Sequence, residues 1–572
     1  MTESDSFPEP TGSSSVDSPE GSGADSPLVE DPATSAPEGS KRSLGVIATI
    51  VAAATLISKI FGLVRQQAIA AAFGTGAAFD AYNYAYVIPG FLLILLGGIN
   101  GPFHSAIVSA LAKQERKQAA ALVETITTLV GIALLVMTVG MIYGADPLIN
   151  LVAPGLGSTE TGAFIHKIAV QQLQIMAPMA MLAGFIGIGF GTLNAADQYW
   201  LPSISPLFSS AAVILGIGGL WLWLGGEIVN PRYAALGGMV LAGSTLLGAI
   251  VQWLVQLPPQ WRAGYGGLRL RFDLRRPGVK DVFQVLIPAT FSSGMLQINV
   301  YTDLFFASYI PQAAAALGYA GLLAMTPLGI LSNMILVPLM PVFSRLVEPS
   351  QWGELKQRIR QGILLTALTM LPIGSLFVVL AKPIVQVVYE RGAFQSDSSQ
   401  IVASLVIAYG VGMFVYLGRD VIVRVFYALG DGNTPFRVSI ISIFLNAGLD
   451  YLCVRVFSLG AAGLVYATVG VNLVSMVILM IILHHRLGGL PLLEWTIAFG
   501  QLFLASLIAG GIAWQVSISL GTTGLWEQAL NLCGSGLVGL IVFVSIVVKF
   551  KIPEVQRFLD QLTERFLSRL RS

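Results

Sequence analysis

The chain has 572 residues, of which 55% are hydrophobic and only 11% are charged, and its formal net charge is +1. Soluble globular proteins carry about 25% charged residues, so this composition excludes a soluble protein and indicates a chain that crosses a membrane many times. No nucleic-acid partner is predicted.

Residues 1–40 differ from the rest of the chain. They contain nine Asp or Glu residues and six Pro residues, and they have no Lys or Arg. Such a segment buries too little apolar surface to offset the loss of chain entropy, so we predict a disordered acidic tail on the cytoplasmic side. It has no basic region followed by a short apolar stretch, and is therefore not interpreted as a signal peptide.

Fourteen later segments are apolar enough to form spanning helices, which need about 20 apolar residues. They are expected at 44–72, 79–112, 120–143, 165–194, 204–225, 233–257, 281–309, 314–345, 361–388, 399–429, 435–457, 461–483, 494–518 and 528–549. The predicted fold is an all-α polytopic membrane protein with 14 transmembrane helices.

Lys and Arg residues concentrate in every second loop. The basic loops lie at 41–42, 113–117, 262–280, 345–360, 486 and 549–565. Basic loops face the cytoplasm, so both termini are predicted to be cytoplasmic. Residues 553–572 place apolar residues on one helical face with Arg residues among the polar positions, which predicts an amphipathic helix on the membrane surface; packing against the protein is the alternative.

Short stretches of the sequence return at a nearly constant spacing. The pairs are Ala145–Val152 with Ala381–Val388, and Phe190 and Leu193 with Phe426 and Leu429, all 236 residues apart, and Tyr84-Ala85 with Tyr319-Ala320, 235 apart. A repeat that spans an even number of helices gives two parallel, pseudo-symmetric six-helix lobes, typical of alternating-access transporters.

This repeat predicts the domain organisation. The predicted parts are an N lobe at 41–262, a basic cytoplasmic linker at 263–280, a C lobe at 281–486, two further helices within 487–552 and the C-terminal amphipathic helix at 553–572.

Two cations, Lys59 and Arg65, lie within the first apolar segment. A charge at bilayer depth costs several kcal/mol unless it faces water or a partner, so both are expected to face a hydrated cavity. The alternative is that their long side chains reach the membrane interface.

The sequence contains the motifs Ser58–Arg65, Phe73-Gly74-Thr75-Gly76, Asp80-Ala81-Tyr82, Ile88-Pro89, Glu390–Phe394 and Arg424–Pro435. Together they resemble the MurJ (MviN) family of lipid II flippases, which belongs to a wider group of two-lobed exporters. The resemblance implies a transporter of the bacterial inner membrane that serves cell-wall synthesis, with a cationic cavity for undecaprenyl-diphosphate-linked peptidoglycan precursor. Membrane lipids are further implied partners, and cell-wall synthesis proteins are candidate ones. No phosphate-binding glycine loop or hydrolytic constellation favours an enzyme.

The resemblance assigns candidate substrate-binding residues. Arg65 matches a family arginine, Lys59 stands where the family usually has another, and Asp80 matches an acid at the start of the second helix. Other family arginines, after Ile88-Pro89 and after Tyr319-Ala320, are missing here.

Two explanations of the missing arginines stay open. The diphosphate is held by fewer cations with help from three polar residues, Asn83, Asn100 and His104, or the substrate is another lipid-linked saccharide. A degenerate transporter acting as a membrane scaffold is a further alternative.

A possible site for a coupling Na⁺ or H⁺ lies in the second half. At a rise of about 1.5 Å per residue, Asp303, Asp450 and Thr468 share one depth, roughly 10 Å below the outer surface. Asn446 lies one turn from Asp450, and oxygen ligands of these types suit a hard cation. The set also resembles a sodium site of some family members. The alternative is that the two carboxylates only accept hydrogen bonds, or that they pair with Arg419, Arg424 or Arg455.

Overall fold

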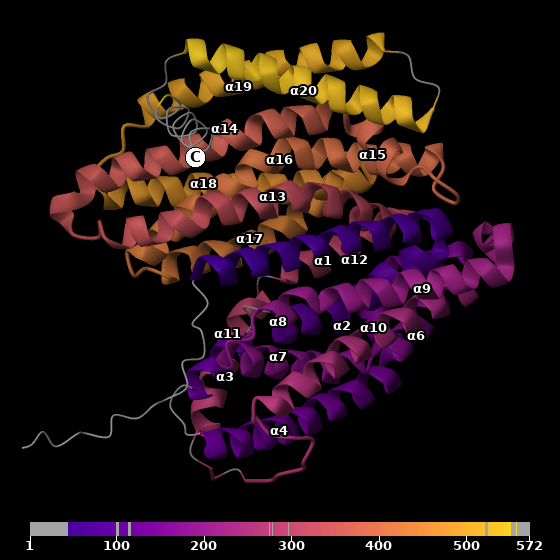
Figure 1. The fold of residues 1–572 in the computed structure, drawn as a ribbon. Coiled ribbons are helices and arrows are strands. Elements are labelled where there is room, and N and C mark those ends of the chain that lie inside the picture. Colours follow the sequence, from indigo (N-terminus) through magenta and orange to yellow (C-terminus); the bar gives the residue numbers. More distant parts are fainter. Residues whose placement is uncertain are drawn as a thin grey trace, which may run out of the picture. The chain divides into compact units, whose positions relative to one another are not determined.

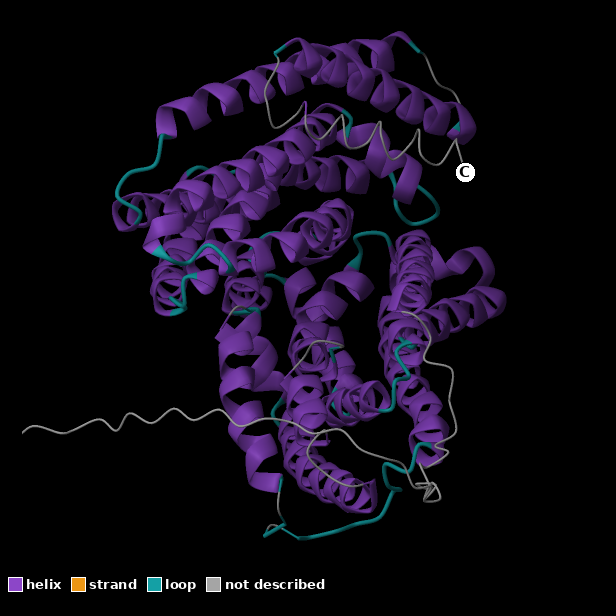
Figure 2. Cartoon of the chain, turned by 60° about the vertical axis from the view of Figure 1, so that its left-hand side comes forward, coloured by secondary structure: helices purple, strands orange, loops and turns teal. Residues whose placement is uncertain are grey.

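The structure is a computed structural model that describes residues 44–98, 102–111, 116–273, 275–276, 278–295, 297–520, 524–550 and 556. Met1–Val46 is one unit, whose described part is the beginning of the first helix, and Ile47–Ser572 is the other. The described residues form helices and no strands, which confirms the predicted fold class (Figure 2). The predicted tail at 1–40 and, except for Gln556, the predicted helix at 553–572 lie outside the described residues.

The α-helices are α1 (Leu44–Phe73), α2 (Ala77–Gly97), α3 (Pro102–Leu111), α4 (Arg116–Tyr143), α5 (Ala145–Val152), α6 (Glu160–Met176), α7 (Met179–Ala195), α8 (Trp200–Ile204), α9 (Pro206–Leu224), α10 (Ala234–Arg262), α11 (Val279–Met295), α12 (Ile298–Ala307), α13 (Ala313–Ser344), α14 (Trp352–Val379), α15 (Ala381–Tyr389), α16 (Ser396–Ala428), α17 (Asn433–Tyr451), α18 (Gly460–Arg486), α19 (Leu492–Ser519) and α20 (Leu525–Lys549). Four short 3-10 helices are η1 (Pro154–Ser158), η2 (Gly225–Val229), η3 (Pro231–Tyr233) and η4 (Pro349–Gln351), and η5 (Leu452–Val456) is a π-helical turn.

Within the described residues, eleven helices are individually long and apolar enough to cross a membrane, and the pair α6 and α7, bent by 41°, makes a twelfth. The other two predicted spans coincide with α1 and with the consecutive helices α11 and α12.

Four predicted spans differ from the structure in detail. The spans at 79–112, 165–194 and 281–309 are each divided into two helices, and the span at 361–388 ends at Val379, so that α15 is a separate helix. Proline accounts for the first two breaks, because Pro102 and Pro178 have no N–H to continue a helix and sit where one begins.

The internal repeat is visible in the helix starts. The helices α2, α4, α5 and α6 begin at residues 77, 116, 145 and 160, and the helices α13, α14, α15 and α16 begin at 313, 352, 381 and 396. Every pair is 236 residues apart, which is the spacing found in the sequence. A short helix therefore follows the equivalent long helix in each half: α5 follows α4, and α15 follows α14.

The packing of the helices follows the two halves. In the first half, α2 packs against α6, α7 and α10, and in the second half α16 packs against α13, α14 and α18. The helices α19 and α20 pack on each other, and α19 lies along α14 (Figure 1). Below, N lobe refers to α2–α10 and C lobe to α12–α18.

The divided span at 281–309 contacts both lobes. Its first helix, α11, packs against α3 of the N lobe, whereas its second helix, α12, packs mainly against α17 of the C lobe and also contacts α18 and, in the N lobe, α5. Because of this division, α12 can bring a polar side chain to the interior of the C lobe.

Candidate functional site

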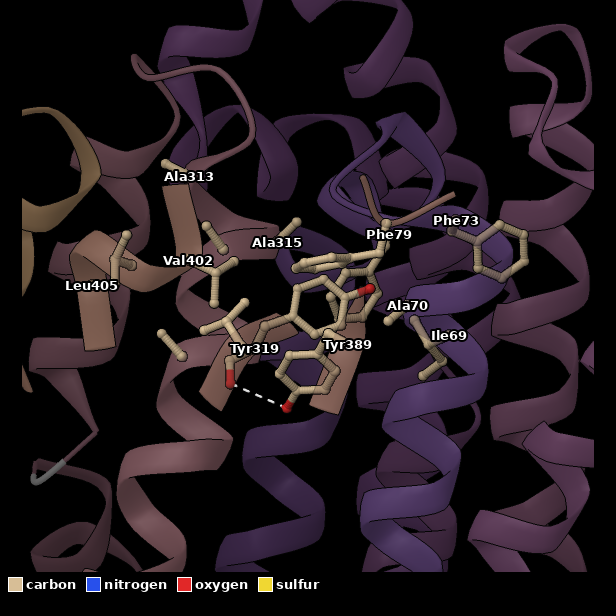
Figure 3. Packing of buried hydrophobic residues seen from close by; sticks show 14 of the residues in the cluster. Ile69, Ala70, Phe73, Phe79, Ala313, Ala315, Tyr319, Tyr389, Val402 and Leu405 are labelled. Atoms are coloured by element: carbon tan, nitrogen blue, oxygen red, sulfur yellow. Dashed lines mark hydrogen bonds between the residues drawn. The ribbon is translucent and has the colours of Figure 1, made fainter. Parts of the chain in front are cut away.

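An aromatic cluster joins the two lobes (Figure 3). The ring of Tyr319 on α13 lies 4.6 Å from that of Phe79 on α2 and 5.0 Å from that of Tyr389 on α15. Its hydroxyl donates to the carbonyl of Gly74 at 2.8 Å, and Tyr389 donates to the carbonyl of Tyr319 at 3.3 Å. Tyr319 is thus a buried hydrogen-bonded contact between the lobes.

Asp80 forms a second contact between the lobes. Its side chain is buried, with the residue only 2% exposed, and Oδ1 accepts a hydrogen bond from the backbone N–H of Ala315 at 2.9 Å. Ala315 lies in the first turn of α13, where unpaired N–H groups and the helix dipole favour an anion. The structure therefore places Asp80 as a cap of α13, and its role in substrate binding stays a prediction.

Two further contacts flank Asp80. The hydroxyl of Thr75 is hydrogen-bonded to Gln312, directly before α13, and to Ser398 near the start of α16. Gly74 has a positive φ of 52°, and a Cβ added there would lie 2.5 Å from the carbonyl oxygen of Ala393. Only glycine allows this approach of the backbones.

We call Gly74, Thr75, Asp80, Gln312, Ala315, Tyr319 and Ser398 the outer clasp. They lie at the ends of α1, α2, α13 and α16, which the predicted topology places at the outer surface. The clasp therefore holds the lobes together at one end of the helices.

A cavity of about 300 Å³, the central cavity, lies between α2, α12, α13 and α16. Its lining includes two residues from different predicted sites, Asn83 and Asp303. Among the described residues that line it, none is Lys or Arg. Gly90 and Phe91, which follow Pro89 where the resembling family has arginines, line it instead.

Arg65 is not among the residues that line this cavity. It is half-buried, and its charge acts on the phenols of Tyr82 and Tyr86, of which Tyr86 lines the cavity. Its Nε is buried and has no hydrogen-bond partner among the described residues. A guanidinium with an unused donor is suited to receive an anionic ligand.

Two other predicted substrate residues, Lys59 and His104, do not line the central cavity. Lys59 is exposed on α1, and its Nζ would lie 3.9 Å from a Cβ added at Gly329 on α13. His104 is half-buried on α3, which packs against α7 and α11, and it lines neither of the cavities described here. Asn100 lies outside the described residues.

The four residues predicted to hold a cation come together inside the C lobe. The amide of Asn446 donates to Asp303 Oδ1 and to Asp450 Oδ2, both at 2.9 Å. The hydroxyl of Thr468 donates to Asp303 Oδ2 at 3.3 Å. Asn446 and Asp450 are fully buried, and each has an Oδ1 atom without a partner among the described residues.

These contacts fit a cation better than an ion pair within the chain. Two neighbouring buried carboxylates repel each other unless a proton or a cation lies between them. Two of the three arginines considered as partners contact other residues: Arg419 pairs with Asp420 at 3.7 Å, and Arg455 lies 4.6 Å from the ring centroid of Tyr309. The described chain has no group of three or more His, Cys, Asp and Glu that could hold a metal ion.

The Arg424–Pro435 motif forms the turn between α16 and α17. Asp431 accepts hydrogen bonds from the backbone N–H and hydroxyl of Thr434, and it pairs with Arg486 at the end of α18. Burial opposes ionisation, but these hydrogen bonds and the Arg486 charge hold the pKa of Asp431 below its ordinary value. The ionised carboxylate thus fastens this turn to α18.

Sequence reasoning missed the aromatic residues around the central cavity. Tyr86, Tyr301 and Tyr409 line it, and they come from α2, α12 and α16. The spacing of Tyr86 from Asn83, three residues on one helix, was the available signal. For Tyr301 and Tyr409 the apolar sequence around them gives no comparable signal.

The chain matches a family model described as "Lipid II flippase MurJ" over residues 69–532. It is 58% identical over 531 residues to "Probable lipid II flippase MurJ" of Synechocystis sp., covering 92% of this chain and 98% of that protein. It is 29% identical over 503 residues to "Lipid II flippase MurJ" of Burkholderia cenocepacia, covering 86% and 94% of the two chains.

Two solved structures share the fold. One is titled "Lipid II flippase MurJ, inward closed conformation", with a TM-score of 0.70 at 21% identity, covering 88% of this chain and 98% of that chain. The other is an inward-facing multidrug resistance MATE family transporter of the MOP superfamily, with a TM-score of 0.55 at 16% identity, covering 77% of this chain and 98% of that chain.

The clasp role of Asp80 predicts a loss of stability when its carboxylate is removed. Asp80→Ala leaves N–H groups of α13 without an acceptor and should lower the free energy of unfolding by about 1–2 kcal/mol. Asp80→Asn keeps an acceptor and should lose less. Thermal unfolding of the purified protein measures this, with Glu348→Ala as a control that changes it little because Glu348 is exposed. An Asp80→Ala protein as stable as the wild type but unable to bind substrate would restore the substrate role.

Proposed function

The chain belongs to the MurJ family of lipid II flippases, and we propose that it moves lipid II from the cytoplasmic to the outer leaflet by alternating access. It is a multi-pass transporter of the bacterial inner membrane that serves peptidoglycan synthesis, and not an enzyme. We further propose that both termini are cytoplasmic, from the basic loops, so that the outer clasp lies at the outer surface.

The observation that carries this proposal is the contact between the lobes at the outer clasp. With the clasp closed, the central cavity is shut off at the outer ends of α2 and α13. Substrate then enters from the cytoplasmic side, and release to the outer leaflet requires the Asp80 and Tyr319 hydrogen bonds to break. The undecaprenyl tail stays in the lipid, near α19 and α20.

We propose that Arg65 is the principal ligand of the lipid II diphosphate. Its planar guanidinium gives bidentate geometry to phosphate, and its Nε lacks a partner within the described protein. Lys59 adds a second positive charge on the same helix, and Asn83 contributes an amide in the cavity wall. The clasp residue Asp80 is excluded from this set.

We propose that Asp303, Asn446, Asp450 and Thr468 hold the cation that drives transport, either Na⁺ or H⁺. The partnerless Oδ1 atoms of Asn446 and Asp450 support this proposal, because buried polar oxygens are normally satisfied. The side-chain oxygens of these residues are the ligand type that a hard cation prefers.

Growth of bacteria depleted of their own lipid II flippase tests the role of Arg65. The wild-type chain should restore growth. Arg65→Ala should restore it poorly, because we expect lipid II translocation to fall at least tenfold when a hydrogen bond to a charged group, which contributes about 1.5–3 kcal/mol, is lost. Arg65→Lys should be intermediate because it loses bidentate geometry. The control is Arg232→Ala, whose exposed guanidinium stacks on Tyr233 at 5.1 Å.

All variants must reach equal membrane levels. Full rescue by Arg65→Ala would remove Arg65 from the site. A correctly inserted wild-type chain that fails to rescue would indicate another lipid-linked saccharide or a scaffold.

Binding of radioactive ²²Na⁺ to the purified protein tests the cation site. Asp450→Ala should weaken Na⁺ binding at least tenfold and abolish stabilisation by Na⁺, which for the wild type reaches about 2.7 kcal/mol at 100 times the Kd. The exposed acid Asp397 provides a control, because Asp397→Ala should bind normally. Transport that is independent of both Na⁺ and pH, and unchanged by Asp450→Ala, would contradict the proposal.

A further inference from the structure

A second cavity, of about 420 Å³, lies inside the C lobe between α12, α16, α17 and α18. We call it the lobe cavity. It reaches the turn between α16 and α17 at Gly432, the end of the lobe opposite to the outer clasp. Its lining includes the polar residues Asn299, Arg419, Ser442 and Asn472.

Three of these polar residues lie one helical turn from the cation site, each on a different helix. Asn299 precedes Asp303 on α12, Ser442 precedes Asn446 on α17, and Asn472 follows Thr468 on α18, all at a spacing of four residues. Residues four apart lie on the same helix face, about 6 Å along the axis.

On all three helices, the lobe-cavity residue lies on the same side of the cation-site residue. Helices α12 and α17 run toward the outer end, and α18 runs back, so the lobe-cavity residue lies on the α16–α17-turn side of the site in each case. A polar face therefore continues from the cation site to the lobe cavity.

The orientation of these polar groups favours a cation. Asn472 uses its amide N–H to bond the carbonyl of Thr468 at 2.8 Å, and Ser442 uses its hydroxyl hydrogen to bond the carbonyl of Val438 at 2.9 Å. Both residues thus keep their oxygen as an acceptor, and Asn299 Oδ1 is a buried atom without a partner among the described residues. Oxygen acceptors solvate a hydrated cation.

Arg419 has a fixed place in the wall. Its guanidinium donates to Ser475 at 2.9 Å and to Ser439 at 3.3 Å, and it lies 3.7 Å from Asp420. A fixed positive charge disfavours a resting cation in the wide part of the cavity, so the carboxylates of Asp303 and Asp450 remain the place where a cation is stable. The cavity has the properties of a passage and not of a second binding site.

We propose that the lobe cavity is a route by which the coupling cation exchanges between its site and the cytoplasm within the C lobe. The inference rests on the proposed cation site. The same site also borders the central cavity, because Asp303 lines it. The site therefore has two accesses, one between the lobes and one through the C lobe, and the cation leaves to the cytoplasm without crossing the space that lipid II occupies.

The test is the rate of ²²Na⁺ exchange in the purified full-length protein. Ser442→Leu fills the cavity but removes none of the four cation ligands, and the hydroxyl it deletes bonds only a helical carbonyl. We infer that exchange through the lobe cavity is much faster than exchange past Asp303 through the central cavity, so we expect the equilibrium Kd to stay within about twofold and the dissociation rate to fall at least tenfold. Phe444→Leu is the matched control, because Phe444 is 75% exposed on the same helix, and it should leave both values unchanged.

Thiol labelling gives a second readout that does not depend on the folding of Ser442→Leu. In a protein with Cys453→Ala and Cys533→Ala, Asn472→Cys should react with a small membrane-impermeant methanethiosulfonate from the cytoplasmic side of proteoliposomes, and Phe444→Cys should not.

The outcomes separate the two proposals. A wild-type chain that binds no Na⁺ and shows no proton-coupled transport overturns the cation site and this route with it. Normal Na⁺ binding, together with an unchanged exchange rate in Ser442→Leu or with no cytoplasmic labelling of Asn472→Cys, overturns the route alone.

Discussion

A charge inside a bilayer must be paired, placed at a helix end or hydrated, and this constraint accounts for the positions of the polar groups in this protein. The carboxylate of Asp80, on α2, faces the beginning of α13, whose N–H groups take the place of water. Arg419 is held by two serines and Asp420. Asp303 and Asp450 share the amide of Asn446, and they still need a positive charge between them. Arg65 lacks a partner for Nε among the described residues, which makes it the natural place for an anionic ligand.

The internal repeat brings equivalent helices of the two halves into contact. Helices α2 and α13 begin 236 residues apart at equivalent places in the two halves, and they meet at the outer clasp. The clasp combines a few hydrogen bonds with the packing of Tyr319 on Phe79, so both kinds of contact must break when the lobes separate at that end. The proposed cation site lies on the C-lobe side of the central cavity, and Asp303 belongs to both. A change in the charge of this site can therefore act on the surface of the C lobe that contacts the N lobe.

Much of the fold could be predicted from the sequence, because the number and place of the long apolar segments depend on hydropathy alone. The breaks could not, since Pro178 divides one span while Pro89 lies within α2 without ending it. The grouping of Asp303 with Asp450 was predictable, because equal depth on neighbouring helices brings them together. The cap that Asp80 forms on α13 was not predictable, because a sequence shows the charge and its depth but not that the beginning of another helix, 235 residues away, lies opposite. Which tyrosines line the central cavity depends on which helix faces face it, and only the packing of the helices determines this.

The most direct test of the account is to lock the outer clasp. Thr75 and Ser398 have hydroxyl oxygens 2.8 Å apart on opposite lobes, so Thr75→Cys with Ser398→Cys, in a chain without its native cysteines, should form a disulfide. Lipid II translocation in proteoliposomes should stop when the disulfide is formed and return when it is reduced. Translocation that continues at the wild-type rate with the cross-link complete would contradict alternating access through this clasp.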